Sequence, residues 1–224
     1  TPRHDAATVR ALERAPGEWA GKLWFATDEL VRARLPPPSS AELAVLSDEA
    51  TAALRGDLRF FSHVRRSCGQ PIDWHRDPTR GARADAASHW CRAVSSAPGD
   101  IKDLWEIGRF PQAYAMVRAA AFEPARKQEL AGALTTQVES FLDDNPFARG
   151  VHWASGQEIA LRLFAWTFAL TMLREVASDR LLVRGARHYH DAAVHIARHI
   201  DYARYATHNN HLLAEAAALL LVAH

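Results

Sequence analysis

Apolar residues recur every three or four positions along most of the chain, which is the spacing of an amphipathic helix. Prolines interrupt this pattern at two places. Pro36, Pro37 and Pro38 separate the second segment from the third. Pro146 ends a later segment, because the residue before a proline avoids the helical region. The pattern predicts helices at residues 4–15, 17–34, 40–55, 100–108, 111–121, 124–143, 155–177, 179–206 and 210–223.

One stretch in the first half of the chain departs from the helical pattern. Residues 56–81 are rich in aromatic and polar side chains and are interrupted by Gly56, Gly69, Pro71, Pro78 and Gly81. We expect a long ordered loop here, with room for a short pair of strands. Loops of this length usually carry function or wrap another surface of the protein.

Two late segments are apolar on almost every face. Residues 159–173 contain one charged side chain, Arg162, and residues 212–222 contain one, Glu215. Both are shorter than the roughly 20 residues that cross a bilayer. A helix that is apolar all round belongs inside a larger helical assembly. We therefore predict an all-α fold, an (α/α) toroid or barrel of antiparallel helix pairs, because a four-helix bundle would leave too many helices over.

The whole chain, residues 1–224, is expected to form one such domain. Its parts are N-terminal helices at 1–55, a loop-rich segment at 56–99 and a helical core at 100–224. The chain begins with Thr1, shows no signal-like segment, and carries an apolar run almost to its last residue. We therefore expect a piece of a longer protein, which would carry further structure to cover that run.

The charge balance excludes some classes of partner. There are 27 Lys and Arg residues against 26 Asp and Glu, so the formal net charge is +1. No overall field would draw the chain to nucleic acid or to an anionic membrane, although a local basic cleft stays open. Only three of the basic residues are Lys. This bias fits either coding bias or the planar recognition of carboxylates and sulfates, at which Arg is better than Lys.

The two cysteines, Cys68 and Cys91, have neither CxxC nor zinc-ligand spacing. One disulfide between them stays open. Asp191, His195 and His199 share a helical face, and His188 and His190 lie nearby. A metal could be imagined there, but no other ligand cluster joins them, and an exposed His-rich face is the favoured interpretation. We expect no metal and no cofactor.

The strongest candidate site is the start of the last predicted helix. Asn209 can cap this helix, which places Asn210 and His211 in its first turn. Free backbone N–H groups and the positive end of the helix dipole make such a turn a natural anion site. Asn210 could add an amide donor to a bound carboxylate, and His211 could act as a base. The alternative is an ordinary cap followed by a surface histidine.

A second candidate lies at the start of the helix predicted at 155–177. Glu158 and Arg162 are four residues apart and can pair, either as a buried bridge or as the lining of a polar cleft. Trp153 precedes this helix, where its ring could stack on a sugar or pack in the core.

A third candidate lies in the helix predicted at 100–108. Lys102 and Glu106 are four residues apart, as are Trp105 and Arg109. Taken alone, this pattern is typical of a solvated helix with one ion pair.

Together these segments resemble a known family. The order DWHRDPTRGARADAASHW (73–90), DIKDLWEIGR (100–109), NPFARGVHWASGQEIALR (145–162) and NNHLLAEAAAL (209–219) is similar to that of the heparinase II/III-like polysaccharide lyases, which include heparan sulfate and alginate lyases. The resemblance covers roughly residues 55–224. It implies an incomplete (α/α) toroid, followed in the family by an antiparallel β-sandwich domain that this chain does not contain.

The resemblance also implies a reaction, β-elimination at a 4-linked uronic acid. Asn210 matches the family's carboxylate-neutralising Asn, and His211 matches the adjacent His, which is a base or a supporting group. The family's acid/base Tyr lies beyond residue 224, so Tyr202 and Tyr205 receive no such role, and we expect the chain alone to be inactive. The resemblance implies that further residues line the cleft with Asn209, namely Trp153, Glu158, Arg162, Trp105, Glu106 and Arg109.

The expected partner is an acidic polysaccharide or oligosaccharide, with neither nucleic acid nor a membrane as a partner. The family resemblance implies a periplasmic or secreted protein. Two other functions stay open. A non-catalytic domain could bind uronate chains through the same Trp and Arg residues. A glycoside hydrolase of the same toroid fold would need two carboxylates that flank the scissile bond, and Glu106 and Glu158 are the candidates.

Overall fold

The structure is a computed structural model that describes Arg10, Glu13, Arg14 and residues 36–95, 97–173, 175–207 and 209–223. The helix predicted at 17–34 lies outside the described residues, as does most of the helix predicted at 4–15. The other predicted helices are confirmed, most of them to within a few residues at each end.

The described elements follow one another in a simple order. The helices are α4 (Ser40–Leu54), α5 (Trp90–Ala93), α6 (Ile101–Gly108), α7 (Pro111–Phe122), α8 (Lys127–Asp144), α9 (Gly156–Leu173), α10 (Asp179–Tyr202) and α11 (Asn210–Ala223). Two 3-10 turns, η1 (Pro124–Arg126) and η2 (Val151–Trp153), precede α8 and α9, and a π-helical segment, η3 (Ala203–Thr207), extends α10. The expected strand pair is the antiparallel hairpin of β1 (Asp57–Phe60) and β2 (Val64–Ser67).

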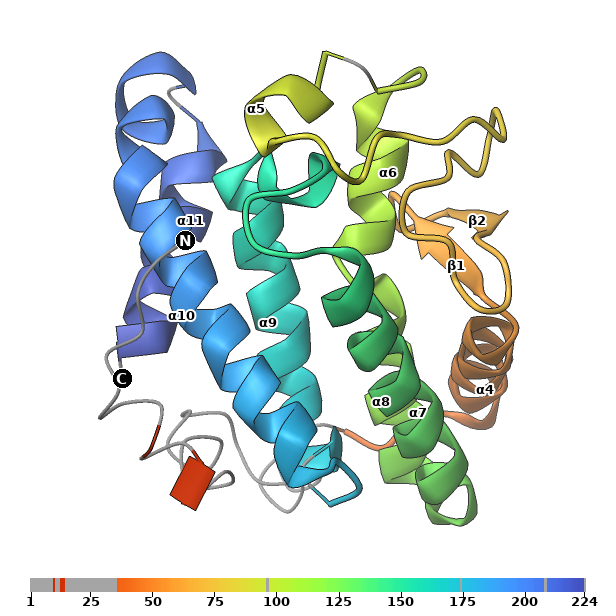
Figure 1. Cartoon of the computed structure of the whole chain (residues 1–224). Helices are drawn as coiled ribbons and strands as arrows, with labels where there is room; N and C mark the ends of the chain where they lie inside the picture. Colours follow the sequence, from red (N-terminus) through yellow and green to blue (C-terminus); the bar gives the residue numbers. More distant parts are fainter. Residues whose placement is uncertain are drawn as a thin grey trace.

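The long helices form two packed layers (Figure 1). In one layer, α9 packs between α7 and α11. In the other layer, α8 contacts α7 and α9, and α10 contacts α9 and α11. Successive helices run in opposite directions, so α7, α9 and α11 each point down in Figure 1 while α8 and α10 point up. This arrangement of antiparallel helix pairs confirms the all-α toroid class predicted from the sequence.

Polar side chains at the helix starts explain where several of these helices begin. Ser39 caps α4 in a capping box, in which its hydroxyl accepts from the backbone N–H of Glu42 and the Glu42 carboxylate accepts from the backbone N–H of Ser39. Asp100 caps α6 and Ser178 caps α10. Each does so through a side-chain oxygen that accepts a hydrogen bond from a free backbone N–H in the first turn. These short-range bonds are readable in the sequence, which is why the predicted boundaries hold.

The core is built around aromatic rings between the layers. The ring of Trp74 stacks on that of Phe110 at a centroid distance of 4.9 Å and meets the edge of Phe141 at 5.1 Å. Phe110 also meets Trp166 edge to face at 5.3 Å. Phe110 has a φ of 58°, in the left-handed region, and none of its surface is exposed. The loop-rich segment therefore supplies part of the core through Trp74.

Of the histidines predicted to form an exposed face, His188 and His195 are buried, whereas His199 is exposed. His188 and His195 are 5% and 3% exposed, and His75 and His152 from earlier segments are also buried. The Trp153 ring lies 5.2 Å from the ring of His188 and 5.7 Å from that of His195. The sequence pattern missed this because α10 presents these residues to the packed layer instead of to solvent.

The two cysteines do not pair in this structure. Cys68 is buried and Cys91 is exposed, and both are free thiols. Among the described residues, no helix is both long and apolar enough to cross a membrane. α9 is buried as expected, whereas α11 leaves Leu213 and Leu220 exposed at 74% and 63%.

Candidate functional site

The predicted site residues gather at one end of the helical layers. α6, the η2 turn, the first turn of α9 and the start of α11 all lie at the upper end in Figure 1. This follows from the alternating direction of the helices, because α9 and α11 both begin where α8 and α10 end. Segments that are far apart in the sequence are therefore brought to the same end of the fold.

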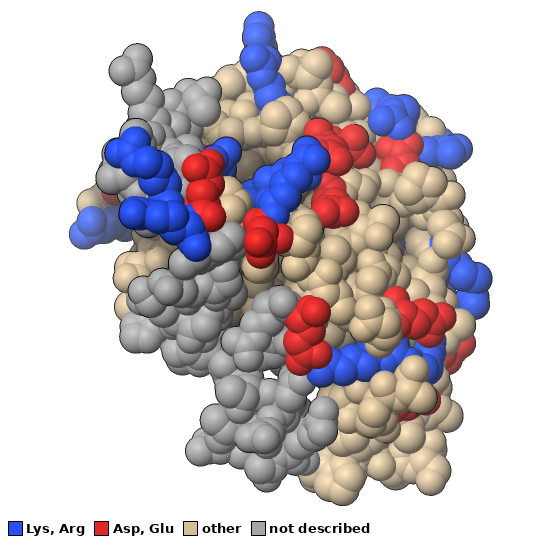
Figure 2. Space-filling model, turned by 60° about the horizontal axis from the view of Figure 1, so that its bottom comes forward, with Lys and Arg blue, Asp and Glu red and all other residues tan. Residues whose placement is uncertain are grey.

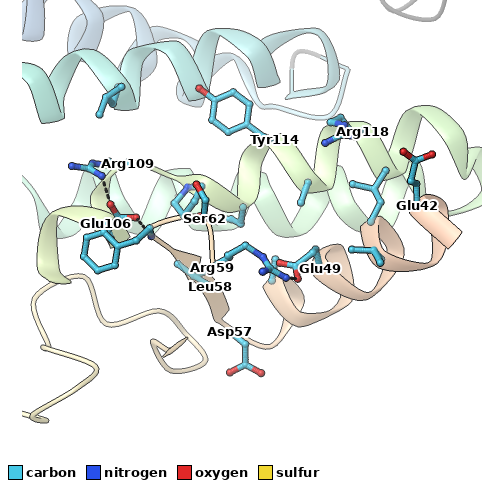
Figure 3. A pocket seen from close by; sticks show the side chains of 18 of the residues that line it. Glu42, Glu49, Asp57, Leu58, Arg59, Ser62, Glu106, Arg109, Tyr114 and Arg118 are labelled. Atoms are coloured by element: carbon cyan, nitrogen blue, oxygen red, sulfur yellow. Dashed lines mark hydrogen bonds and ion pairs between the residues drawn. The ribbon is translucent and has the colours of Figure 1, made fainter. Parts of the chain in front are cut away.

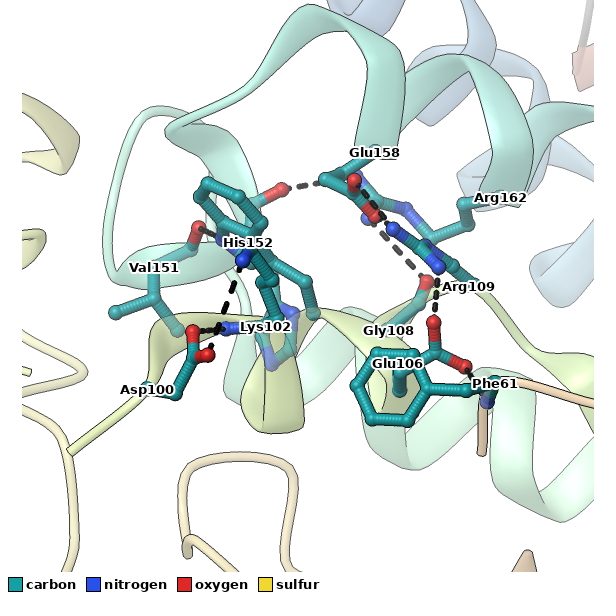
Figure 4. Close-up of polar contacts among 11 residues, drawn as sticks. Phe61, Asp100, Lys102, Glu106, Gly108, Arg109, Val151, His152, Glu158 and Arg162 are labelled. Atoms are coloured by element: carbon teal, nitrogen blue, oxygen red, sulfur yellow. Dashed lines mark hydrogen bonds and ion pairs between the residues drawn. The ribbon is translucent and has the colours of Figure 1, made fainter. Parts of the chain in front are cut away.

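Arg109 is the centre of a polar network at this end (Figure 4). Its Nη2 donates to Glu158 Oε1 at 2.7 Å, its Nε donates to the other oxygen of Glu158, and its Nη1 donates to Glu106 Oε1. The backbone N–H of Phe61 donates to Glu106 Oε2 at 2.9 Å. Burial lowers the pKa of Arg109, but its bonds to Glu158 and Glu106 outweigh this effect and raise the pKa above its usual value.

This network corrects two predicted ion pairs. Glu158 pairs with Arg109 from α6 instead of with Arg162 on its own helix. Glu106 likewise pairs with Arg109 instead of with Lys102. Nζ of Lys102 lies 3.9 Å from Oδ2 of Asp100. The Arg109 guanidinium is thus bonded to both carboxylates. Arg109 therefore offers no unpaired guanidinium to an anionic sugar at this point.

Arg162 supports the site from inside the protein. Its side chain is 0% exposed. It donates to the carbonyl oxygens of Gly108 and His152 at 3.4 and 3.3 Å and to Nε2 of His188 at 3.4 Å. The guanidinium carbon lies 4.8 Å from the centre of the Phe141 ring. Burial lowers the pKa of Arg162 to about 9. A side chain with no exposed surface cannot touch a polysaccharide, so the predicted substrate contact by Arg162 is not supported.

The two tryptophans of the predicted site also have structural roles. Trp153 is 1% exposed and its Nε1 donates to the carbonyl of Asn145 at 3.3 Å, so its ring packs in the core and cannot stack on a sugar. Trp105 is partly exposed, and its Nε1 donates to the carbonyl of Val151 at 3.1 Å. Through this bond α6 holds the η2 turn that leads into α9.

The start of α11 is as the sequence predicted. The backbone N–H of His211 donates to Oδ1 of Asn209 at 2.9 Å, so Asn209 caps the helix that begins at Asn210. Asn209 and Asn210 are exposed and His211 is partly exposed. Exposed amides, an imidazole and free N–H groups at a helix start can hold an anionic group. In contrast to Arg109, none of these three side chains is engaged by a carboxylate of the described residues.

Glu215 is a residue that the site prediction left out. It lies four residues after His211 on α11 and is 4% exposed. A Cβ placed on Gly156, the first residue of α9, would lie 2.6 Å from the Glu215 carboxyl, so the lack of a side chain there lets α9 and α11 approach. Burial raises the pKa of Glu215 to about 7. The sequence identifies Glu215 as the one charged residue in an apolar segment, but it does not show that Gly156 lies next to it.

A groove opens beside the Arg109 network, between α4 and α7 (Figure 3). It has a volume of about 950 Å³. Glu106 and Arg109 line one end of it, and Tyr114 and Arg118 on α7 continue the wall. We call this cavity the α4–α7 groove. No pattern in the sequence indicated this groove, because its walls come from segments that are far apart along the chain.

Several charged groups elsewhere on the described surface are paired with one another. Figure 2 shows basic and acidic side chains next to one another on the face that it presents. Lys127 lies 2.7 Å from Glu175, and Arg184 lies 2.6 Å from Asp143. Within the part of the chain that the structure describes, no group of three or more His, Cys, Asp or Glu side chains could hold a metal ion.

Comparisons with known proteins give one structural likeness. No family model and no curated protein matches the chain. A solved structure of a mutant heparan sulfate lyase, HepC from Pedobacter heparinus, matches with a TM-score of 0.64 and 18% sequence identity. The match covers 96% of this chain and 31% of that chain, so the chain spans about a third of the length of the lyase. At this identity the likeness shows that the two share the helical fold.

Proposed function

We propose that this chain is the helical substrate-binding part of a polysaccharide lyase that acts on a uronic-acid polysaccharide by β-elimination. The observation that carries the proposal is the capped and exposed start of α11, where Asn210 and His211 are free to meet an anionic ligand. The helical fold shared with a heparan sulfate lyase supports the same reaction class.

In this proposal, α11 binds the uronate carboxylate. The Asn210 amide and the free N–H groups of the first turn donate to it and offset its charge as the enolate-like transition state develops. Stabilising that state makes the C5 proton easier to remove, and His211 is the base or supports it. The electron pair of the C5–H bond forms the new C4–C5 double bond as the C4–O bond breaks. No acid for the leaving oxygen is assigned among the described residues.

The buried groups have supporting roles in this proposal. Arg162 joins the carbonyls at the end of α6 and in the η2 turn, and Trp105 joins the same two elements. Both bonds hold the first turn of α9 against α6. Gly156, which has no side chain, lets Glu215 on α11 pack closely on the start of α9. The end of the fold that carries Asn210 is thereby kept rigid, as a preorganised site requires.

The glycoside hydrolase alternative is not favoured. A hydrolase needs two carboxyl groups that are free to flank a glycosidic bond, roughly 5–10 Å apart. Glu106 and Glu158 instead converge on the same guanidinium, and their side chains are 5% and 6% exposed. Neither is free to act as an acid or a nucleophile in this arrangement.

The test is the lyase reaction in the natural polypeptide that carries this chain. We expect Asn210→Ala to abolish formation of the unsaturated uronate, followed by its ultraviolet absorbance on heparan sulfate and alginate, with an unchanged melting temperature. Arg184→Ala on α10 is the matched control, because Arg184 is paired with Asp143 away from α11. Full turnover by Asn210→Ala would remove Asn210 from the mechanism. Binding of uronate chains without unsaturated product in the wild type would favour a non-catalytic binding domain.

A further inference from the structure

The α4–α7 groove differs from the start of α11 in its shape, its charged side chains and its aromatic lining. It is a hollow that is partly open to solvent instead of an exposed helix start, and its volume of about 950 Å³ is at the upper end of the range for small-molecule sites. We infer that this groove binds an uncharged, hydroxyl-rich sugar unit of the polysaccharide. The inference rests on the proposed function for the saccharide nature of the ligand.

The charges in the groove argue against a second carboxylate. Four carboxylates line it, those of Glu42, Glu49, Asp57 and Glu106, against three guanidiniums, those of Arg59, Arg109 and Arg118. Along the α4 wall, Glu49 is already bonded to Arg59 and to Arg65. An anionic sugar placed here would meet more carboxylates than guanidiniums, which disfavours it in a partly buried site.

The other end of the groove is balanced. Arg118 makes no hydrogen bond or ion pair among the described residues, but it lies close enough to Glu42 to contribute to a lowered pKa of that carboxyl, after the larger effect of the bonds with Ser39. A guanidinium and a carboxylate that face one groove can donate to and accept from neighbouring hydroxyls. Their charges cancel, so they favour polar and uncharged groups.

The groove also offers an aromatic surface. Tyr114 is 40% exposed, and its ring packs against that of Phe168 at 5.3 Å, which holds it in place. Phe61 lines the same groove and is 43% exposed. Figure 3 shows Tyr114 between Arg109 and Arg118 along α7. The apolar face of a sugar ring can pack on such a ring while its hydroxyls reach the flanking polar groups.

The test is a titration of the full chain, followed by NMR, with two probes. One probe is an uncharged tetrasaccharide of β-1,4-linked glucose, and the other is a tetrasaccharide of galacturonate. We expect the uncharged probe to shift the signals of groove residues, with an affinity that does not change with salt. Tyr114→Ala should weaken this binding by about tenfold, the effect of about 1.4 kcal/mol of lost ring contact. Tyr114→Phe should keep most of it, and Arg184→Ala should have no effect.

Two results would overturn the inference. One is that the uncharged probe binds equally well to Tyr114→Ala or leaves the groove signals unmoved. The other is that only the galacturonate probe binds through Tyr114, with an affinity that falls as salt rises. Lyase activity is measured separately, so the two proposals can fail independently. Groove binding without lyase activity in the natural polypeptide refutes the proposed reaction alone, and lyase activity without groove binding refutes the groove alone.

Discussion

Two glycines in helices provide a matched test of how tightly α6 packs on the η2 turn. Gly108 is the last residue of α6, and a Cβ built on it would lie 2.3 Å from Nδ1 of the buried His152 ring. Gly132 lies inside α8, and a Cβ built there meets nothing within 4 Å. Gly→Ala at each site therefore makes the same chemical change in opposite surroundings.

The expected effects have opposite signs. At Gly132 the added methyl stabilises the helix by about 0.5–1 kcal/mol, because the unfolded chain loses freedom and nothing clashes. At Gly108 a methyl forced into a packed core costs about 1–3 kcal/mol, from which the same helix gain is subtracted. His152 cannot move aside easily, because it is buried and its Nε2 is bonded to the carbonyl of Trp74 at 2.6 Å. The two variants should therefore differ in free energy of unfolding by about 1–3 kcal/mol.

The assay is urea unfolding of wild type, Gly108→Ala and Gly132→Ala under one set of conditions. For a chain of this size, about 1 kcal/mol corresponds to roughly 2–4 °C in melting temperature, so thermal unfolding is an independent check. If Gly108→Ala were as stable as Gly132→Ala, the close packing of α6 on His152 would be refuted. In Gly108→Ala, the Arg109 side chain should also be displaced as stability is lost, because the two residues are adjacent.

The remaining predictions concern thiols and acid stability. Burial raises the pKa of Cys68 to about 12, whereas Cys91 is exposed. A colorimetric thiol reagent should therefore modify Cys91 quickly in the folded protein and leave Cys68 unmodified. Fast labelling of both cysteines would contradict the burial of Cys68. Burial lowers the pKa of His152 from 6.5 to about 3, so between these values the unfolded chain binds a proton that the folded chain does not. The free energy of unfolding should fall as pH drops through this window, and His152→Gln should reduce the slope. An identical slope in that variant would show that His152 titrates normally.

The sequence predicted the helices well because their signals are local. The apolar period, the caps at Ser39, Asp100 and Ser178, and the break at Pro146 each act within a few residues. The cap at Asn209 is of the same kind, which is why the start of α11 was also found. Its role with Asn210 and His211 in a lyase stays a prediction, since the shared fold alone does not test it.

The sequence failed where a residue's role depends on a distant partner. Spacing on one helix predicted a bond between Glu158 and Arg162, but Glu158 is taken by Arg109, which comes from another helix. The same spacing could not tell that Arg162 points into the core. His188 and His195 of α10 were assigned to the surface for this reason, because a helical period shows which residues share a face and not what covers that face.

The amino-acid sequence by itself determined that the chain forms antiparallel helices, that its middle is a loop with a hairpin, and that a capped helix start carries Asn210 and His211. Hydrogen bonds and apolar spacing within a few residues are sufficient for that much. Only the tertiary structure decided which charged side chains are paired and which side chains are buried. It pairs Arg109 with two carboxylates, buries Arg162 and Trp153, and opens a groove beside Tyr114. These outcomes depend on contacts between helices that are far apart in the sequence, and no local pattern encodes them.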